Sequence, residues 1–97
     1  MESYRFVLFV AGMTTRMERA VENLRHACDA RLPGAYEIEI VDVLEHPEIA
    51  EAEKILATPT LIKSAPEPQR RIMGDVADAE RALAALGVAS TPEQDAR

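Results

Sequence analysis

The first apolar stretch of the chain is typical of a strand that is covered on both sides. Aromatic and aliphatic residues follow one another from Tyr4 to Val10, and Arg5 is the only charged residue among them. A strand with two apolar faces lies in the middle of a sheet, because a half-exposed strand alternates apolar with polar residues. We therefore expect residues 4–10 to form a central strand.

The next segment has the period of a helix. Thr15 and Glu18 have the spacing of a capping box, which predicts that the helix begins at Thr15. Apolar side chains then recur at steps of three and four residues and form one stripe, which consists of Met17, Val21, Leu24 and Cys28. The helix is expected to end at residues 32–34, where a proline and a glycine follow a leucine.

A second strand and a short helix are expected next. Residues 36–43 begin with alternating apolar and acidic residues, so one face of this strand is exposed at its start. The strand, helix and strand together make a βαβ unit with a right-handed crossover. His46 and Pro47 then open a short acidic helix, in which Ile49 and Ala52 are the expected buried side chains.

A hairpin is predicted in the second half of the chain. Residues 54–64 have the composition of a strand, although Pro59 within them marks an edge, a bulge or a special turn. Residues 70–73 form a brief strand. Because only a few residues separate the two strands, we expect them to pair antiparallel.

The final helix completes a recognisable arrangement. It is expected to start near Asp75 or Asp78 and to end at Gly87, with an apolar stripe made of Val76, Ala79, Leu83 and Leu86. The element order is then β-α-β-α-β-β-α, with a mixed four-stranded sheet and helices on both of its faces, which is the thioredoxin-like arrangement. We assign residues 1–88 to this single domain and residues 89–97 to a flexible C-terminal tail.

Charge and composition restrict the class of partner. The 97 residues include 11 Lys and Arg against 17 Asp and Glu, which gives a net charge of −6. Such a charge argues against nucleic acid and anionic membranes, both of which bind cationic faces. The sequence contains no apolar run of the roughly 20 residues that a membrane span needs and no signal-peptide pattern. One cysteine cannot form an internal disulfide, which fits a cytoplasmic protein.

Thiol chemistry is not expected from this sequence. A thioredoxin-like enzyme keeps a thiol at the start of its first helix, where the helix dipole stabilises a thiolate. Residues 12–16 contain no cysteine, and Cys28 lies near the opposite end of that helix on its apolar stripe. We interpret Cys28 as a buried structural thiol.

Metal, cofactor and hydrolytic sites are not expected either. His26 and Cys28 are two residues apart on a helix, so their side chains point to different faces. His46 stands among carboxylates in what is interpreted as a solvated acidic turn. The sequence also has no phosphate-binding loop, no nucleophile elbow and no dinucleotide fingerprint. We expect no catalytic residue, no metal and no cofactor.

Two features remain as candidates for a function. Pro59 in the sequence Thr58-Pro59-Thr60 stands where thioredoxin-like folds have a cis proline, the alternative being an ordinary trans proline on an edge. The other is a set of cations, which consists of Arg19, Lys54, Lys63, Arg70 and Arg71. The alternative interpretation of these cations is scattered surface charge. Neighbouring residues of a strand point to opposite faces, so only one of Arg70 and Arg71 can serve a given surface.

Several segments together resemble the KaiB family of circadian-clock proteins. They are Val10 to Gly12 after the first strand, Ile40 to Leu44, Lys54 to Leu61 (KILATPTL) and Arg70 to Asp75 (RRIMGD). The resemblance extends from about Arg5 to Leu86 without a gap. It is specific, because the last two motifs occur together.

This resemblance implies a regulator and not an enzyme. KaiB proteins bind the N-terminal ATPase ring of KaiC, an autokinase, and modulate its phosphorylation cycle. They also switch fold between an inactive tetramer with a rearranged C-terminal half and a thioredoxin-like monomer that binds KaiC, which requires two packings of similar free energy. On this resemblance, the KaiC-facing positions are Arg19, Lys54, Lys63, Arg70 and Arg71.

The sequence departs from the family pattern at informative positions. The second strand carries Glu37 and Glu39 where the cyanobacterial family usually has a lysine that contacts KaiA, and this argues against KaiA as a partner. Met13 and Thr15 stand where the family often has asparagine and proline. Ala85 replaces a glycine of some relatives, which favours the helix by about 1 kcal/mol and predicts a larger population of the thioredoxin-like state.

Other functions remain as alternatives at this stage. One is regulation of a KaiC that serves a stress response without oscillation. A second is a thiol oxidoreductase of the thioredoxin class, against which the missing helix cysteine argues. A third is the sensor domain of a histidine kinase such as SasA, although no kinase region is present in these residues. Whether the free chain is a monomer, a dimer or a tetramer is left open.

Overall fold

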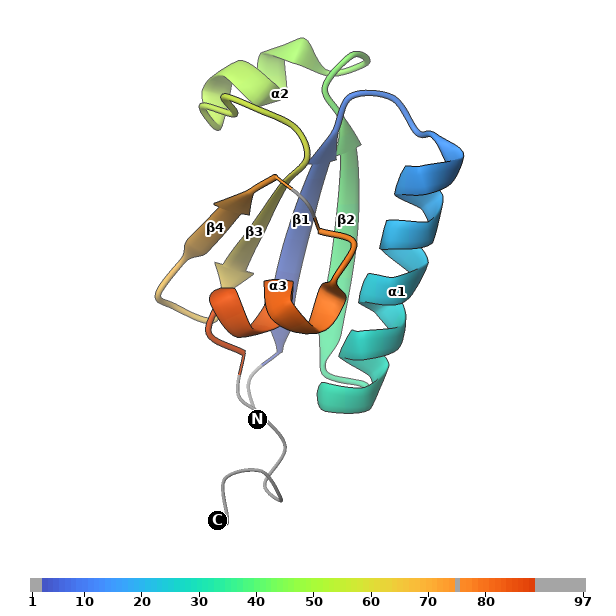
Figure 1. Ribbon diagram of the computed structural model, residues 1–97. Coiled ribbons are helices and arrows are strands. Elements are labelled where there is room, and N and C mark those ends of the chain that lie inside the picture. Colours follow the sequence, from blue (N-terminus) through green and yellow to red (C-terminus); the bar gives the residue numbers. More distant parts are fainter. Residues whose placement is uncertain (1–2, 75, 89–97) are drawn as a thin grey trace.

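The computed structural model describes residues 3–74 and 76–88. Within these residues, four strands and three helices follow one another in the expected order β-α-β-α-β-β-α (Figure 1). Their bounds are β1 Tyr4–Val10, α1 Thr15–Arg31, β2 Tyr36–Asp42, α2 Pro47–Ala52, β3 Thr60–Ala65, β4 Arg70–Met73 and α3 Ala79–Ala85. The predicted tail, residues 89–97, lies outside the described residues.

The four strands form one mixed sheet in the order β2-β1-β3-β4. β1 pairs parallel with β2 and antiparallel with β3, and β3 pairs antiparallel with β4. The predicted central position of β1 is therefore confirmed. The fold is thioredoxin-like, with α1 and α3 packed on one face of the sheet (Figure 1).

The two faces of the sheet are covered unequally. Among the described residues, fifteen buried ones from the sheet, α1, α3 and the segments that flank α3 form the main core, with Phe6, Leu8, Leu24, Leu61 and Leu83 completely buried. On the other face the buried cluster consists, within the described part of the chain, of Phe9, Val41 and Ile62. The hydrophobic stabilisation of the fold is thus concentrated between the sheet, α1 and α3.

α1 begins at Thr15 as expected, but its N-cap differs from the expected one by one residue. Thr14 is the N-cap, and its hydroxyl oxygen accepts a hydrogen bond from the main-chain N–H of Met17 at 3.1 Å. The predicted cap, Thr15, is the first residue of the helix. Both threonines are exposed and stand next to each other, so the Glu18 spacing alone selected the wrong one.

Two predictions around α2 are also wrong. None of the described side chains of α2 is buried, whereas Ile49 and Ala52 were expected in the core. β3 begins at Thr60 and not at Lys54, because residues 53–59 form turns that connect α2 to the sheet. Pro59 therefore precedes the strand and does not interrupt it.

α3 begins at the second of its two expected starts. Asp78 is its N-cap and accepts from the main-chain N–H of Arg81 at 3.1 Å. Val76 precedes the helix and is buried in the main core. An ion pair between Arg31 and Glu80 joins the end of α1 to the start of α3.

Within 3–74 and 76–88, no helix has both the length and the apolar character that a membrane crossing requires.

Candidate functional site

The strand register brings four connecting segments to one end of the sheet. β1 and β2 end together, with Val10 opposite Asp42. β3 begins with Thr60 next to Phe9, and β4 ends with Met73 opposite Thr60. The segments 11–14, 43–46, 53–59 and the described residues 74 and 76–78 therefore lie there, and we call this region the sheet end.

Asp42 fixes two of these segments relative to each other. Its Oδ1 accepts hydrogen bonds from the main-chain N–H groups of Gly12 and Leu44, both at 3.0 Å. Gly12 has a φ of +81°, and a Cβ at this position would lie 3.8 Å from Leu44 Cδ1. One carboxylate thus connects the loop before α1 to the loop before α2.

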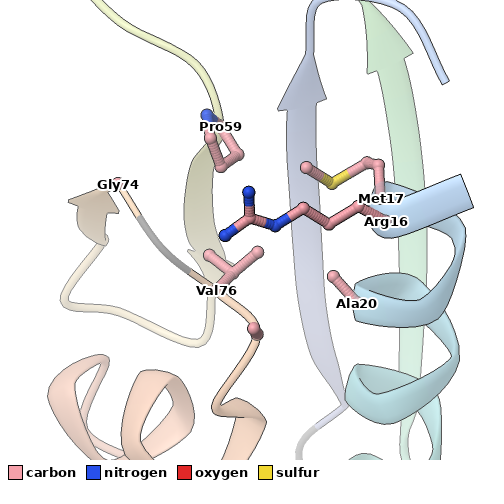
Figure 2. Close-up of a pocket in the computed structure, with 7 residues that line it drawn as sticks. Arg16, Met17, Ala20, Pro59, Gly74 and Val76 are labelled. Carbon is pink, nitrogen blue, oxygen red and sulfur yellow. The ribbon is translucent and has the colours of Figure 1, made fainter. Parts of the chain in front are cut away.

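A pocket of about 320 Å³ opens at the sheet end between α1 and the segment that leads to α3. The Thr58–Pro59 peptide bond is cis, and the carbonyl of Pro59 accepts from the N–H of Gly74 at 2.9 Å. Figure 2 shows the guanidinium of Arg16 extending from α1 into the space between Pro59 and Val76. We call this the Pro59 pocket.

Arg16 is a candidate residue that the sequence analysis missed. It lines the Pro59 pocket together with Met17 and Ala20, which are apolar neighbours on α1. A signal was available, because Arg16 is four residues before Ala20 and so lies on the same side of the helix. The pocket combines an apolar wall with one exposed cation, an arrangement that suits an acidic or amide-bearing segment of another molecule.

Thiol chemistry is disfavoured at this site. The predicted burial of Cys28 is confirmed, since its exposed fraction is 0%. Burial, and next the nearby Asp29 carboxylate, raises the pKa of the Cys28 thiol to about 11. A reactive thiol needs the opposite shift, and Cys28 does not line the Pro59 pocket.

The sheet end also carries large apolar side chains in contact with solvent. Leu56 is 85% exposed, Leu44 70%, Met73 59% and Met13 42%. Each belongs to a different connecting segment or strand end. Their common location at the sheet end is therefore a result of the fold and not of the local sequence. Clustered exposed apolar residues with polar neighbours mark protein-binding surfaces.

The sequence analysis did not single out these four residues. Met13 and Leu44 stand in predicted loops beside a glycine and a glutamate, whereas Leu56 and Met73 were assigned to the predicted strands 54–64 and 70–73. A single exposed apolar residue is common on protein surfaces. Only their placement at one end of the sheet makes them a candidate surface.

The five predicted cations are divided between different places. Arg71 lies on the face that carries α2, where its Nη1 donates to the main-chain carbonyl of Glu53 at 3.1 Å. Lys54 follows Glu53 directly and is exposed, with a φ of +57°. Arg19 is exposed on α1, three residues after Arg16. Lys54 and Arg71 are thus brought together near the sheet end.

Lys63 and Arg70 lie on the opposite face of the sheet. Lys63 is only 4% exposed, and its ammonium nitrogen lies 5.9 Å from the centre of the Tyr4 ring, within cation–π distance. Arg70 pairs with Lys63 in the register and packs against Gly87. The expectation that Arg70 and Arg71 point to opposite faces is confirmed. The interpretation of Lys63 as surface charge is wrong, because this face of β3 is covered.

The described residues hold no group of three histidine, cysteine or acidic side chains arranged for a metal ion. His46 Nδ1 lies 3.5 Å from a carboxylate oxygen of Glu48, and both side chains are largely exposed. This pair forms the solvated start of α2.

Comparison with protein families identifies residues 7–88 as a KaiB domain. Curated relatives are named circadian clock oscillator protein KaiB. The protein from Prochlorococcus marinus (strain MIT 9313) is 47% identical over 85 residues, which are 88% of this chain and 71% of that protein. The protein from Synechococcus elongatus (strain ATCC 33912 / PCC 7942 / FACHB-805) is 42% identical over 94 residues, which are 97% of this chain and 92% of that protein.

Solved structures share the fold at lower identity. The N-terminal domain of Synechococcus elongatus SasA superimposes with a TM-score of 0.61 at 19% identity, over 84% of this chain and 76% of that domain. Mitochondrial thioredoxin 3 from Saccharomyces cerevisiae gives a TM-score of 0.67 at 18% identity, over 89% of this chain and 78% of that protein.

Proposed function

Because this chain belongs to the KaiB family, we propose that it is a non-enzymatic clock or timer regulator that docks on the N-terminal ATPase ring of a KaiC-type autokinase. Docking modulates the phosphorylation cycle of the autokinase, and the protein acts in the cytoplasm. The observation that carries the proposal is the match of residues 7–88 to the KaiB domain, supported by 42–47% identity to KaiB clock proteins.

The sheet end supplies a suitable docking surface. Its exposed apolar side chains offer contact area, and Asp42 holds two of the loops that carry them. Arg16 adds a cation beside the Pro59 pocket, and Lys54 and Arg71 add two more near α2. A cationic region on a chain of net charge −6 favours approach to a partner in one orientation.

The cations that the family resemblance selects have unequal parts in this proposal. Arg19, Lys54 and Arg71 are exposed and can contact a partner directly. Arg70 is also exposed, although it lies on the face that carries α3. Lys63 is buried beside Tyr4, so in this conformation it supports the fold, and a direct contact requires a rearrangement of the C-terminal half.

KaiA is not included as a partner in this proposal. Glu37 and Glu39 are exposed on β2, which is an edge strand of the sheet. Carboxylates at positions that usually carry a lysine oppose a partner surface that is complementary to a cation.

The test is gel filtration with light scattering of this protein mixed with the KaiC homologue from the same genome and ATP. We expect co-elution with the KaiC hexamer, after an incubation long enough for a fold switch. Failure to co-elute in every nucleotide and phosphorylation state would refute the proposal. The mass of the free protein in the same experiment gives its resting oligomeric state.

Charge reversal locates the docking surface. Lys54→Glu and Arg71→Glu should abolish or strongly weaken the complex, because each replaces a cation near the sheet end by an anion. Arg25→Glu is the matched control, since Arg25 is an exposed arginine in the distal half of α1. Equal loss of binding in all three variants would mean that net charge, and not this surface, governs the interaction.

A time course of KaiC phosphorylation distinguishes a clock regulator from a regulator of a KaiC that does not oscillate. A periodic phosphorylation signal in the reconstituted mixture supports a clock. A monotonic approach to a new steady state supports the stress-response alternative.

A further inference from the structure

A second groove lies on the face of the sheet that carries α2. It has a volume of about 190 Å³ and is lined by residues of β1, β2, β3 and α2, among them Val7, Glu39, Ile49 and Ile62, and by Glu53 directly after α2. Its floor is the small apolar cluster Phe9, Val41 and Ile62, with Val7 half-buried beside it. α2 covers this face incompletely, because none of its described side chains is buried.

The groove carries negative charge and lacks a cation. Glu39 and Glu53 are both exposed lining residues, one on β2 and the other at the end of α2. No described lysine, arginine or histidine forms an ion pair with either carboxylate. Arg71 donates to the main-chain carbonyl of Glu53 and not to its carboxylate.

We propose that this groove binds a partner protein through an aliphatic side chain flanked by lysine or arginine. The apolar floor accepts the aliphatic group, and Glu39 and Glu53 pair with the flanking cations. The volume supports a side chain as the occupant, because sites for free small molecules usually enclose about 300–1,000 Å³. The surface is separate from the Pro59 pocket, with which it shares no lining residue.

This assignment goes beyond the proposed docking on KaiC. The proposed KaiC surface uses cations at the sheet end, whereas the groove requires a basic partner. The two surfaces therefore select partners of opposite charge.

The test uses a defined probe, a short capped peptide with leucine between two lysines, and a matched peptide with two glutamates. Binding is followed by methyl NMR of the full chain at low salt. We expect the lysine peptide to shift the methyl signals of Val7, Val41 and Ile62, with an affinity that falls as salt is added. The glutamate peptide should leave these signals unchanged.

Substitutions then separate the groove from general electrostatics. The double variant Glu39→Lys with Glu53→Lys should lower the affinity for the lysine peptide at least about tenfold, which corresponds to about 1.4 kcal/mol. Glu22→Lys is the control, because Glu22 is an exposed carboxylate on α1 and lies outside the groove. A single Glu39→Lys variant, on the far side of the groove from Arg71, should still co-elute with KaiC, so the two proposals fail independently.

Several results would overturn the inference. The groove is not the site if the peptide shifts residues of the Pro59 pocket instead, or shifts no methyl signal at millimolar concentration. Equal binding of the two peptides would remove the role of the carboxylates. Self-association that protects Val7 and Ile62 in the absence of peptide would identify a second copy of this chain as the occupant.

Discussion

Cys28 shows how position along a helix determines the chemistry of a side chain. It lies on the inner side of α1, three residues before the helix ends, and is fully buried in the main core. The start of α1, where the dipole would stabilise a thiolate, carries Thr14 and Thr15 instead. Desolvation and the Asp29 carboxylate both favour the neutral thiol, so its pKa rises to about 11 from an ordinary value of 9.0.

We predict that Cys28 resists thiol reagents in the folded protein. At pH 8, a pKa of 11 in place of 9 leaves about 100-fold less thiolate, and burial slows access further. An aromatic disulfide reagent should therefore react at least about 100-fold more slowly with the native protein than with the protein in urea. Comparable rates in the two conditions would contradict the burial of this side chain.

At the scale of an element, the start of α1 depends on one hydroxyl group. Thr14 has extended backbone angles and caps the N–H of Met17, whereas Thr15 is already helical. The same turn carries Arg16 into the Pro59 pocket, so the cap also fixes a residue of the candidate site (Figure 2).

Replacing the two threonines separately distinguishes cap from helix. Thr14→Ala should lower the free energy of unfolding by about 1 kcal/mol, because it removes the cap. Thr15→Ala should change it by less than about 0.5 kcal/mol, since alanine is the better helix former at an exposed helical position. Urea denaturation of both variants measures the difference. A larger loss for Thr15→Ala would restore the capping box that the sequence predicts.

The strands show what their own pattern could predict. Two apolar faces identified β1 as central, and this holds because a central strand is buried on both sides whatever covers it. The strand composition of residues 54–64 was less informative. Ile55 and Leu56 have the composition of a strand but belong to the connection after α2, where Leu56 is 85% exposed.

At the scale of the whole molecule, the unequal faces of the sheet predict unequal local stability. The main core joins α1, α3 and the sheet, while α2 rests on a three-residue cluster and contributes no buried side chain of its own among those described. Segments with few buried contacts open with a lower free energy than the molecule as a whole.

Native-state hydrogen exchange should reveal this difference. The amides of Ala50 and Glu53, which are bonded within the α2 turn, should exchange about 100-fold faster than those of Leu8 and Leu61. That ratio corresponds to an opening free energy lower by about 2.8 kcal/mol. Uniform protection of all four amides would show that α2 unfolds only with the rest of the domain.

By itself, the sequence determined the order of the elements, the central place of β1, the burial of Cys28 and the opposite directions of Arg70 and Arg71. These properties follow from local periodicity. A repeat of apolar residues every two or about every 3.6 positions indicates which side chains share a face of a strand or a helix. The family could also be identified from motifs that are contiguous in the chain, such as residues 54–61 and 70–75.

Only the tertiary structure decided which of these side chains form a surface. Met13, Leu44, Leu56 and Met73 are far apart in the chain and lie at the same end of the sheet because the register brings four connecting segments there. Lys63 is buried because other elements cover the face of the sheet on which it lies. The sequence of its own segment does not indicate that this face is covered. Register and the covering of a face depend on contacts between distant segments, and local periodicity contains no information about those contacts.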